Sequence, residues 1–185
     1  IAMCPADGDS LDDVLRHADT ALVRAKEMGR DHYAFFTERM GSDIRARLAM
    51  QQQLRGAICR DEFAVHYQPQ MCLRTGALLG AEALLRWDNP VLGKVPPGLF
   101  IALAEEYGSI TAIGEWVLES VCAQIRAWHD GGLGSIKVAV NLSGKQFAQD
   151  RTVPFVEAVL RKYGIAPACL GIEITESTVM GDPDK

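Results

Sequence analysis

The sequence predicts an α/β protein with a mostly parallel sheet, and two observations support that prediction. From Phe63 onward, strand-like segments alternate with segments whose apolar residues recur at helical spacing. Glycine residues directly follow the helical segments, at the places where helices commonly end. Strands separated by helices are typical of βα units. In folds of this class, functional residues lie at the carboxyl ends of the strands.

The first sixty residues predict two helices and little core. Ser10 is a suitable N-cap, apolar residues follow it at helical spacing, and Gly29 stands where this first helix should end. Residues 33–36 (YAFF) are expected to form a short strand. So small a segment buries little apolar surface alone, which indicates the end of a domain whose body lies upstream. Residues 42–60 are polar with sparse apolar positions, and they predict a connecting helix.

The remaining residues predict strands and helices in alternation. The strand-like segments are 63–71, 76–87, 136–143 and 169–177. The helical segments are 96–108, a long one whose apolar residues run from 113 to 128, and one whose apolar residues run from 155 to 163. This order predicts a sheet that is covered by helices.

Composition and charge argue against several classes of function. The 185 residues carry a net charge of −5 with a pI of about 5.4, so a broad basic surface for nucleic acid is not expected. The five cysteines form no CxxC pair and are odd in number, which favours reduced thiols in a cytosolic compartment. No apolar run approaches the roughly 20 residues that span a bilayer, so no membrane contact is expected from this segment. Ile1 begins a stretch that resembles the end of a strand, so further chain is expected before it.

Three strand-like segments each carry an oxygen donor. Alternation places Asn141 and Glu173 opposite the aliphatic faces of their strands, and it places Glu82 on the same face as Arg86. If the strand ends converge, two carboxylates and one amide would meet, and this donor set suits Mg²⁺, Mn²⁺ or Ca²⁺. An unpaired carboxylate is costly to bury, which favours the metal site. The alternative is that Glu82 pairs with Arg86 or with solvent, and the strand pattern leaves both interpretations open.

Four ordered motifs give the chain a family resemblance. They are HYQP (66–69), GAEALLRW (80–87), AVNLSGKQF (139–147) and EITES (173–177). In this order and spacing they closely resemble the EAL-domain family of bacterial signalling proteins. The resemblance implies the N-terminal portion of a modified (β/α)₈ barrel. It also implies metal-dependent hydrolysis of cyclic di-GMP to linear pGpG, with two divalent cations, Mg²⁺ or Mn²⁺.

The resemblance further implies roles for individual residues. Those roles are metal ligands through which catalysis proceeds, at Glu82, Asn141 and Glu173; substrate-binding residues, at Gln68 and Arg86; and a residue that supports a neighbouring loop, at Glu176. The guanidinium fork of Arg86 suits a substrate phosphate, and Gln68 would line the substrate groove.

The beginning of the chain resembles a second family. Residues 18–31 (ADTALVRAKEMGRD) are similar to the last helix of the GGDEF, or diguanylate cyclase, domain. The GGDEF motif itself does not occur in the sequence, so nothing in this chain supports cyclase activity. The expected domains are a C-terminal fragment of a GGDEF domain at 1–40, a connecting helix at 41–60, and the N-terminal half of an EAL domain at 61–185.

The chain ends at GDPDK, before the family's next strand and its Asp-Asp-Phe-Gly motif. We therefore expect hydrolysis from the full-length parent protein and not from residues 1–185 alone. A non-catalytic cyclic di-GMP receptor is the alternative, and an interaction module with a coupling helix at 42–60 is a third interpretation. The resemblance implies a domain in the cytoplasm, or on the cytoplasmic face of a membrane-anchored parent. Its expected partners are cyclic di-GMP and a second copy in a homodimer.

Overall fold

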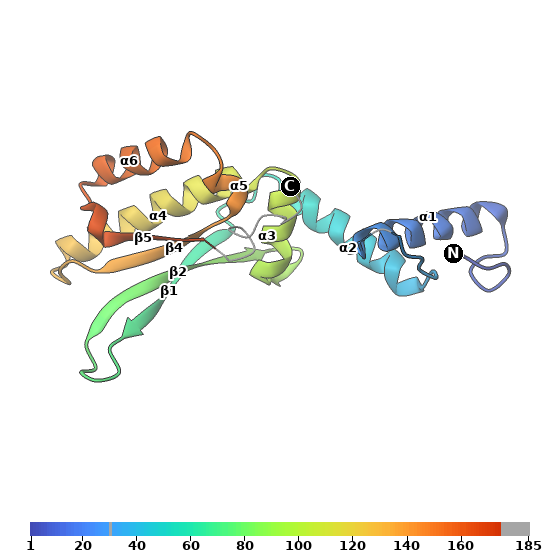
Figure 1. Ribbon diagram of the computed structural model, residues 1–185, viewed down its shortest axis with the longest axis horizontal. Coiled ribbons are helices and arrows are strands. Elements are labelled where there is room, and N and C mark those ends of the chain that lie inside the picture. The colour runs from blue at the N-terminus through green and yellow to red at the C-terminus, as the bar shows by residue number, and fades with distance from the viewer. Residues whose placement is uncertain (30, 175–185) are drawn as a thin grey trace. The chain divides into compact units, whose positions relative to one another are not determined.

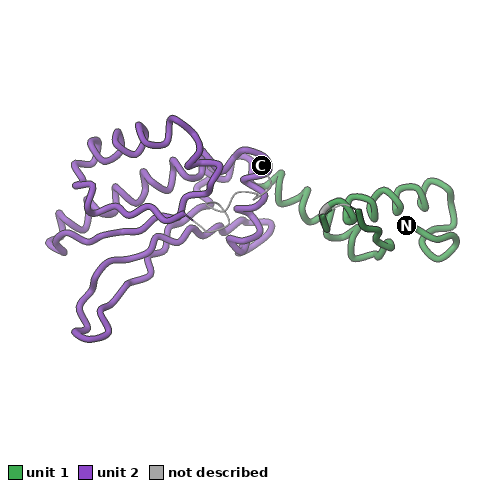
Figure 2. The backbone as a smooth tube through the Cα atoms, in the orientation of Figure 1, with its two compact units in different colours: residues 1–53 green, residues 54–185 purple. Residues whose placement is uncertain are grey.

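The computed structural model describes residues 1–29 and 31–174 (Figure 1). The chain divides into two compact units, residues 1–53 and residues 54–185 (Figure 2). No described helix combines the length and the apolar character that a bilayer-spanning segment needs. The five cysteines are all free thiols.

The first unit contains helix α1 (Leu11–Glu27) and nearly all of helix α2 (Glu38–Leu54). The side chain of Ser10 accepts the backbone N–H of Asp13 at 3.1 Å, so Ser10 caps α1 as the sequence predicts. Helix α2 begins and ends earlier than the predicted segment 42–60. It ends early because Gly56, two residues beyond Leu54, has a φ of 77°, a backbone conformation that a right-handed helix excludes.

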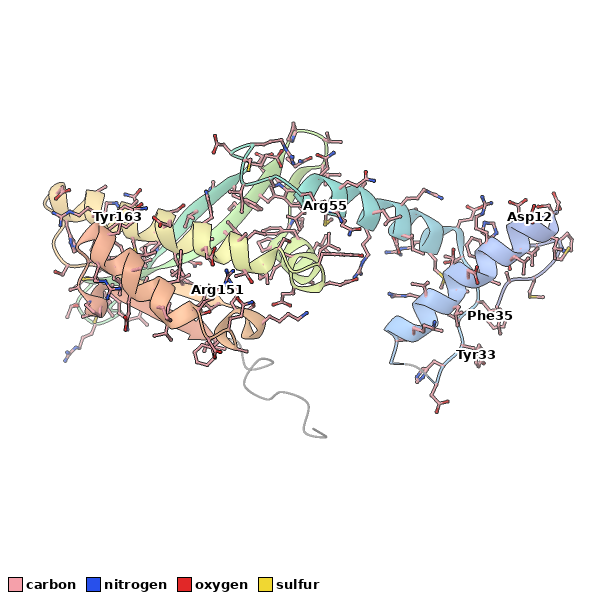
Figure 3. The ribbon with its side chains drawn as sticks, turned by 90° about the horizontal axis from the view of Figure 1, so that it is seen from above. Asp12, Tyr33, Phe35, Arg55, Arg151 and Tyr163 are labelled. Atoms are coloured by element: carbon pink, nitrogen blue, oxygen red, sulfur yellow. The ribbon has the colours of Figure 1, made fainter. Side chains whose placement is uncertain are left out.

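The short strand predicted at residues 33–36 is wrong. These residues belong to no strand, and among residues 1–29 and 31–174 their ladder-like hydrogen bonds involve Ile1, whose N-terminal amine donates to Ala34 O at 2.7 Å and whose carbonyl accepts Phe36 N–H at 2.8 Å. One residue is too short a partner for a strand. Tyr33 and Phe35 are exposed on the outside of this unit (Figure 3).

The second unit is built on a mixed sheet in the order β1-β2-β4-β5, with β3 paired to β2 outside this path. The strands are β1 (Phe63–Met71), β2 (Leu78–Asn89), β3 (Gly93–Val95), β4 (Lys137–Leu142) and β5 (Leu170–Ile174). Strand β4 is parallel to both β2 and β5, whereas β1 and β3 are antiparallel to β2. The prediction of a mostly parallel sheet therefore fails at β1, and the short strand β3 was not predicted from the sequence. Short turns join both strands to β2, and a parallel connection needs a longer crossover.

Helices cover one side of the parallel strands, as the sequence predicts. The helices of this unit are α3 (Pro97–Glu106), α4 (Ile110–Asp130), α5 (Gly144–Phe147) and α6 (Thr152–Tyr163), with a 3₁₀ turn, η1, at Pro167–Cys169. Helix α4 packs against β4 and against α6, and Figure 1 shows α4 and α6 side by side over β4 and β5.

The core lies between α4 and β4. The larger aliphatic residues of β4 are almost fully buried, as are the residues of α4 that face the interior: Val138, Val140, Leu142, Val121 and Ile125. Strand β5 is less well covered, because Ile172 remains 38% exposed. Among the described residues β5 pairs only with β4, so its far edge has no neighbouring strand there.

Strands β2 and β4 lie very close together at Gly80. A Cβ atom on Gly80 would lie 2.5 Å from the carbonyl oxygen of Lys137, so the backbone itself would have to move. We expect Gly80→Ala to lower the free energy of unfolding by about 1–3 kcal/mol, as overpacking does. Chemical denaturation monitored by circular dichroism measures this change.

Gly98→Ala is the matched control for this substitution. Gly98 lies in α3 and has no atom within 4 Å of an added Cβ, so alanine is expected to be neutral or slightly stabilising there. Equal stability of the Gly80 and Gly98 variants would contradict the close approach of β2 and β4.

Candidate functional site

A row of polar side chains crosses the sheet on one face. Gln68 on β1 is directly opposite Glu82 on β2, and Asn141 on β4 is directly beside Glu173 on β5. Residues paired in this way on neighbouring strands point to the same side of a sheet. The amide nitrogen of Asn141 donates a hydrogen bond to Glu82 Oε1 at 2.8 Å and so joins the two pairs. The structure therefore brings these four side chains to one face, across four strands.

The position of the row follows from local sequence. Asn141 and Glu173 are each the next-to-last residue of a parallel strand, so both lie at the carboxyl ends of β4 and β5. Glu82 reaches the same level because β4 pairs with residues 80–83 of β2, with Ala139 beside Glu82. This is the edge of an α/β sheet where functional groups commonly gather.

The row concentrates negative charge. Glu82 is half-buried and Glu173 is exposed, and no lysine, arginine or histidine within residues 1–29 and 31–174 forms an ion pair with either carboxylate. The only described hydrogen bond to these two groups is the one from Asn141 to Glu82. Because its nitrogen faces Glu82, the carbonyl oxygen of Asn141 is left for another partner. Two carboxylates with an amide oxygen are suitable donors for a hard divalent cation.

The donor set is small. Within the described part of the chain there is no cluster of three histidine, cysteine, aspartate or glutamate residues that could hold a metal ion. The predicted site has only two acidic groups there, and its third donor is an amide. Glu176, predicted to support a loop, lies outside the described residues.

Arg86 does not neutralise Glu82. Its Nη1 donates to the carbonyl oxygen of the preceding residue, Leu85, at 2.9 Å. Arg86 and Glu82 are on the same face of β2, and four residues of a strand span about 13 Å. The alternative of an ion pair between them is therefore wrong for this structure, and the guanidinium is displaced along the strand from the carboxylates.

A cavity of about 290 Å³ adjoins Arg86 and Asn141. Its wall is mainly apolar, with Leu84 and Pro97 among the lining residues, and Ser143 and Gln146 add polar groups. Such a cavity with a few convergent polar groups is typical of small-molecule sites. It lies at the same edge of the sheet as the row of donors.

A larger hollow of about 1080 Å³ lies within residues 1–53 and has a different character. Its wall mixes acidic and basic side chains, and some of these pair with each other, as Arg16 does with Asp13 at 2.6 Å. Size alone does not make a site, and we assign the chemistry to the sheet edge because its carboxylates form no such ion pair in the part of the chain that the structure describes.

Sequence reasoning missed a structural element next to the site. Ser143 and Gln146 form a capping box at the start of α5, and the box begins two residues after Asn141. The pattern S-x-x-Q after a strand was the available signal. A second missed group surrounds Glu62, whose carboxylate accepts hydrogen bonds from Trp87 Nε1 and Asn89 Nδ2, both at 2.9 Å.

An α/β sheet that gathers oxygen donors at the carboxyl ends of its strands defines a domain suited to a divalent cation. The sequence profile of the EAL domain matches residues 51–185. The chain therefore belongs to the EAL-domain family.

Two curated relatives illustrate the similarity. The chain is 42% identical over 184 residues to the bifunctional diguanylate cyclase/cyclic di-GMP phosphodiesterase MucR of Pseudomonas aeruginosa, and the match covers 100% of this chain and 27% of MucR. It is 37% identical over 180 residues to the cyclic di-GMP phosphodiesterase PdeR of Escherichia coli, with 97% of this chain and 27% of PdeR covered. The chain thus spans about a quarter of the length of these relatives.

Solved structures give the same relationship. The PaMucR phosphodiesterase in complex with c-di-GMP aligns with a TM-score of 0.69 and 44% identity, covering 74% of this chain and 55% of that chain. The FimX EAL domain of Xanthomonas citri in complex with c-di-GMP aligns with a TM-score of 0.64 and 26% identity, covering 75% of this chain and 53% of that one.

Proposed function

We propose that the full-length protein containing this chain hydrolyses cyclic di-GMP to linear pGpG. The observation that carries the proposal is the meeting of Glu82, Asn141 and Glu173, with a 2.8 Å hydrogen bond from Asn141 to Glu82 and Asn141 in register with Glu173. The relatives MucR and PdeR are named as cyclic di-GMP phosphodiesterases, which supports the proposal.

Mg²⁺ or Mn²⁺ fits the donors that are present. Glu82, Asn141 and Glu173 would hold the cation through oxygen atoms, which both ions prefer. A bound divalent cation supplies Lewis-acid charge to the scissile phosphodiester. The two carboxylates would supply the negative charge that retains the cation, and the hydrogen bond from Asn141 orients the Glu82 carboxylate.

The neighbouring residues suit an anionic dinucleotide. Arg86 presents a guanidinium along the same face of β2, where it would bind phosphate oxygens away from the cation. Gln68 lies opposite Glu82 and would donate or accept hydrogen bonds along the ligand. The mainly apolar cavity of about 290 Å³ beside Arg86 would exclude water from part of the bound ligand.

The test is turnover of cyclic di-GMP by the purified full-length protein. We expect pGpG to accumulate in Mg²⁺ or Mn²⁺, to stop when EDTA removes the cation, and to resume when the cation is restored. Chromatographic separation of the two nucleotides measures this. A second arm uses residues 1–185 alone, which we expect to be inactive. Turnover that continues in EDTA would refute the metal-dependent mechanism.

A non-catalytic cyclic di-GMP receptor is the second candidate. The observation in its favour is that FimX EAL domains, which share this fold, are described as bound to cyclic di-GMP. Tight binding of cyclic di-GMP by the full-length protein without any pGpG formation would establish this function instead.

We also propose that β5 is continued by further strands of a modified (β/α)₈ barrel and that residues 1–40 end a GGDEF domain. Ile172 on β5 is 38% exposed at an edge that a further strand would cover. Leu11, Leu15 and Leu22 of α1 are all more than half exposed, as expected for a helix that has lost a covering layer. The match to MucR extends over residues before position 51 as well.

A cytoplasmic location agrees with five free thiols, and a homodimer stays a prediction.

A further inference from the structure

A buried glutamine follows Asn141 closely in the chain. Gln146 is only 6% exposed, and its Oε1 accepts the backbone N–H of Ser143 at 3.0 Å. In return, the backbone N–H of Gln146 donates to Ser143 Oγ at 3.4 Å. This capping box closes the turn that begins two residues after Asn141.

The same side chain fixes the turn to the longest helix. Gly114 of α4 lies so close to Gln146 that a Cβ atom on Gly114 would be 1.7 Å from Gln146 Nε2. The glutamine amide therefore packs against bare helix backbone. At its other end, the carbonyl oxygen of Gln146 accepts Thr152 Oγ1 at 2.5 Å, at the start of α6. One residue thus connects the end of β4 with two helices.

We propose that Gln146 is a positioning residue, which holds Asn141 in the orientation that places its amide 2.8 Å from Glu82. The inference rests on the proposed function, since Asn141 matters as a cation ligand. The carboxyl end of β4 is where the chain leaves the sheet, so Asn141 has only one further strand residue, Leu142, to restrain it. Replacing a residue that orients a metal ligand typically lowers metal affinity 10–100-fold.

Two variants separate the hydrogen bond from side-chain size. Gln146→Met keeps the length of the side chain and loses the acceptor for Ser143 N–H. Gln146→Glu keeps an acceptor, and glutamate serves in capping boxes as glutamine does. We expect isothermal titration of the full-length protein with Mn²⁺ to show affinity about 10–100-fold weaker for Gln146→Met and within about threefold of wild type for Gln146→Glu.

Loss of stability needs its own control. Val121 is fully buried in α4, does not line the cavity and is not part of the capping box, so Val121→Ala is expected to destabilise the core without removing a hydrogen bond of Gln146. We expect Val121→Ala to lower the melting temperature and leave Mn²⁺ affinity unchanged. If Gln146→Met weakens binding no more than Val121→Ala, the glutamine is merely structural and the proposal is overturned.

A metal-free readout distinguishes failure of this inference from failure of the proposed function. The two asparagines of the sequence are Asn89 and Asn141, and Asn89 is fully buried and donates to Glu62, so it serves as an internal reference. In ¹⁵N NMR spectra without metal, Gln146→Met is expected to change the chemical shift of the Asn141 side-chain amide and speed its hydrogen exchange as the hydrogen bond to Glu82 is lost, while the Asn89 signal is unchanged. An unchanged Asn141 signal, identified by its loss in Asn141→Ala, would overturn the positioning role even if wild type fails to bind Mn²⁺.

Discussion

Replacing Glu82 by glutamine is expected to slow the hydrolysis of cyclic di-GMP at least about 100-fold. Replacing a residue that hydrogen-bonds to a metal ligand typically lowers metal affinity or activity 10–100-fold. Replacing the ligand itself should lower activity at least as much. The substitution removes one of the two carboxylate charges in the row and keeps the volume of the side chain. Glutamine also keeps an acceptor for Asn141 Nδ2, so the fold should persist. Initial rates of pGpG formation in saturating Mn²⁺ measure the loss.

Glu157→Gln is the surface control, because Glu157 is exposed on α6 and forms an ion pair with Arg161. It should turn over substrate at the wild-type rate. If Glu82→Gln retained more than a tenth of wild-type activity, Glu82 would not be a ligand of the catalytic cation.

Replacing Glu62 by alanine is expected to produce the largest loss of stability, on the order of 3 kcal/mol. The Glu62 carboxylate is almost fully buried and accepts hydrogen bonds from Arg60 Nε at 2.5 Å and from Trp87 Nε1 and Asn89 Nδ2 at 2.9 Å each. Alanine would leave the buried Trp87 and Asn89 donors without this acceptor. At roughly 2–4 °C per kcal/mol, the melting temperature should fall by about 6–12 °C.

The effect of Glu62 should depend on pH. The hydrogen bond from Arg60, with those from Trp87 and Asn89, lowers the pKa of Glu62 from its usual 4.5 to about 2, although burial opposes the shift. A carboxylate with a lowered pKa stabilises the folded state fully above its unfolded pKa and loses that effect as pH falls. The stability difference between wild type and Glu62→Ala should therefore be constant near neutral pH and shrink between about pH 4.5 and 2. A constant difference down to pH 2 would refute this role for the carboxylate.

Local patterns predicted most elements of the second unit. Alternating residues such as Val138 and Val140 identified β4, and helical spacing identified α4 and α6. The antiparallel pairing of β1 with β2 does not follow from alternation within either strand. It follows from the length of their connection, because residues 72–77 are too few for a parallel crossover, and the prediction of a mostly parallel sheet overlooked this length. The strand predicted at residues 33–36 failed for a related reason. Its residues favour extended backbone, but a strand also requires a partner of sufficient length, and that partner is non-local.

The candidate site was predicted to a similar degree. Strand alternation predicted the face of its own strand on which each of Glu82, Asn141 and Glu173 lies. The register between strands then brings these faces to the same side of the sheet. The position of Gln146 against Gly114 could not be foreseen, since it depends on how α4 packs over the turn. The hydrogen bonds to Glu62 likewise join residues 25 and 27 positions away.

Alternate residues of strand β2 have different roles, because one face of the strand carries site residues and the other is buried in the core. Glu82, Leu84 and Arg86 share one face of the strand, whereas Ala81 and Trp87 are buried on the opposite face and do not line the cavity. Randomising the first set would therefore search new ligand preferences, and randomising Ala81 and Trp87 would search thermal tolerance without changing a residue of the site. For a protein engineer, a single strand thus offers two separate libraries.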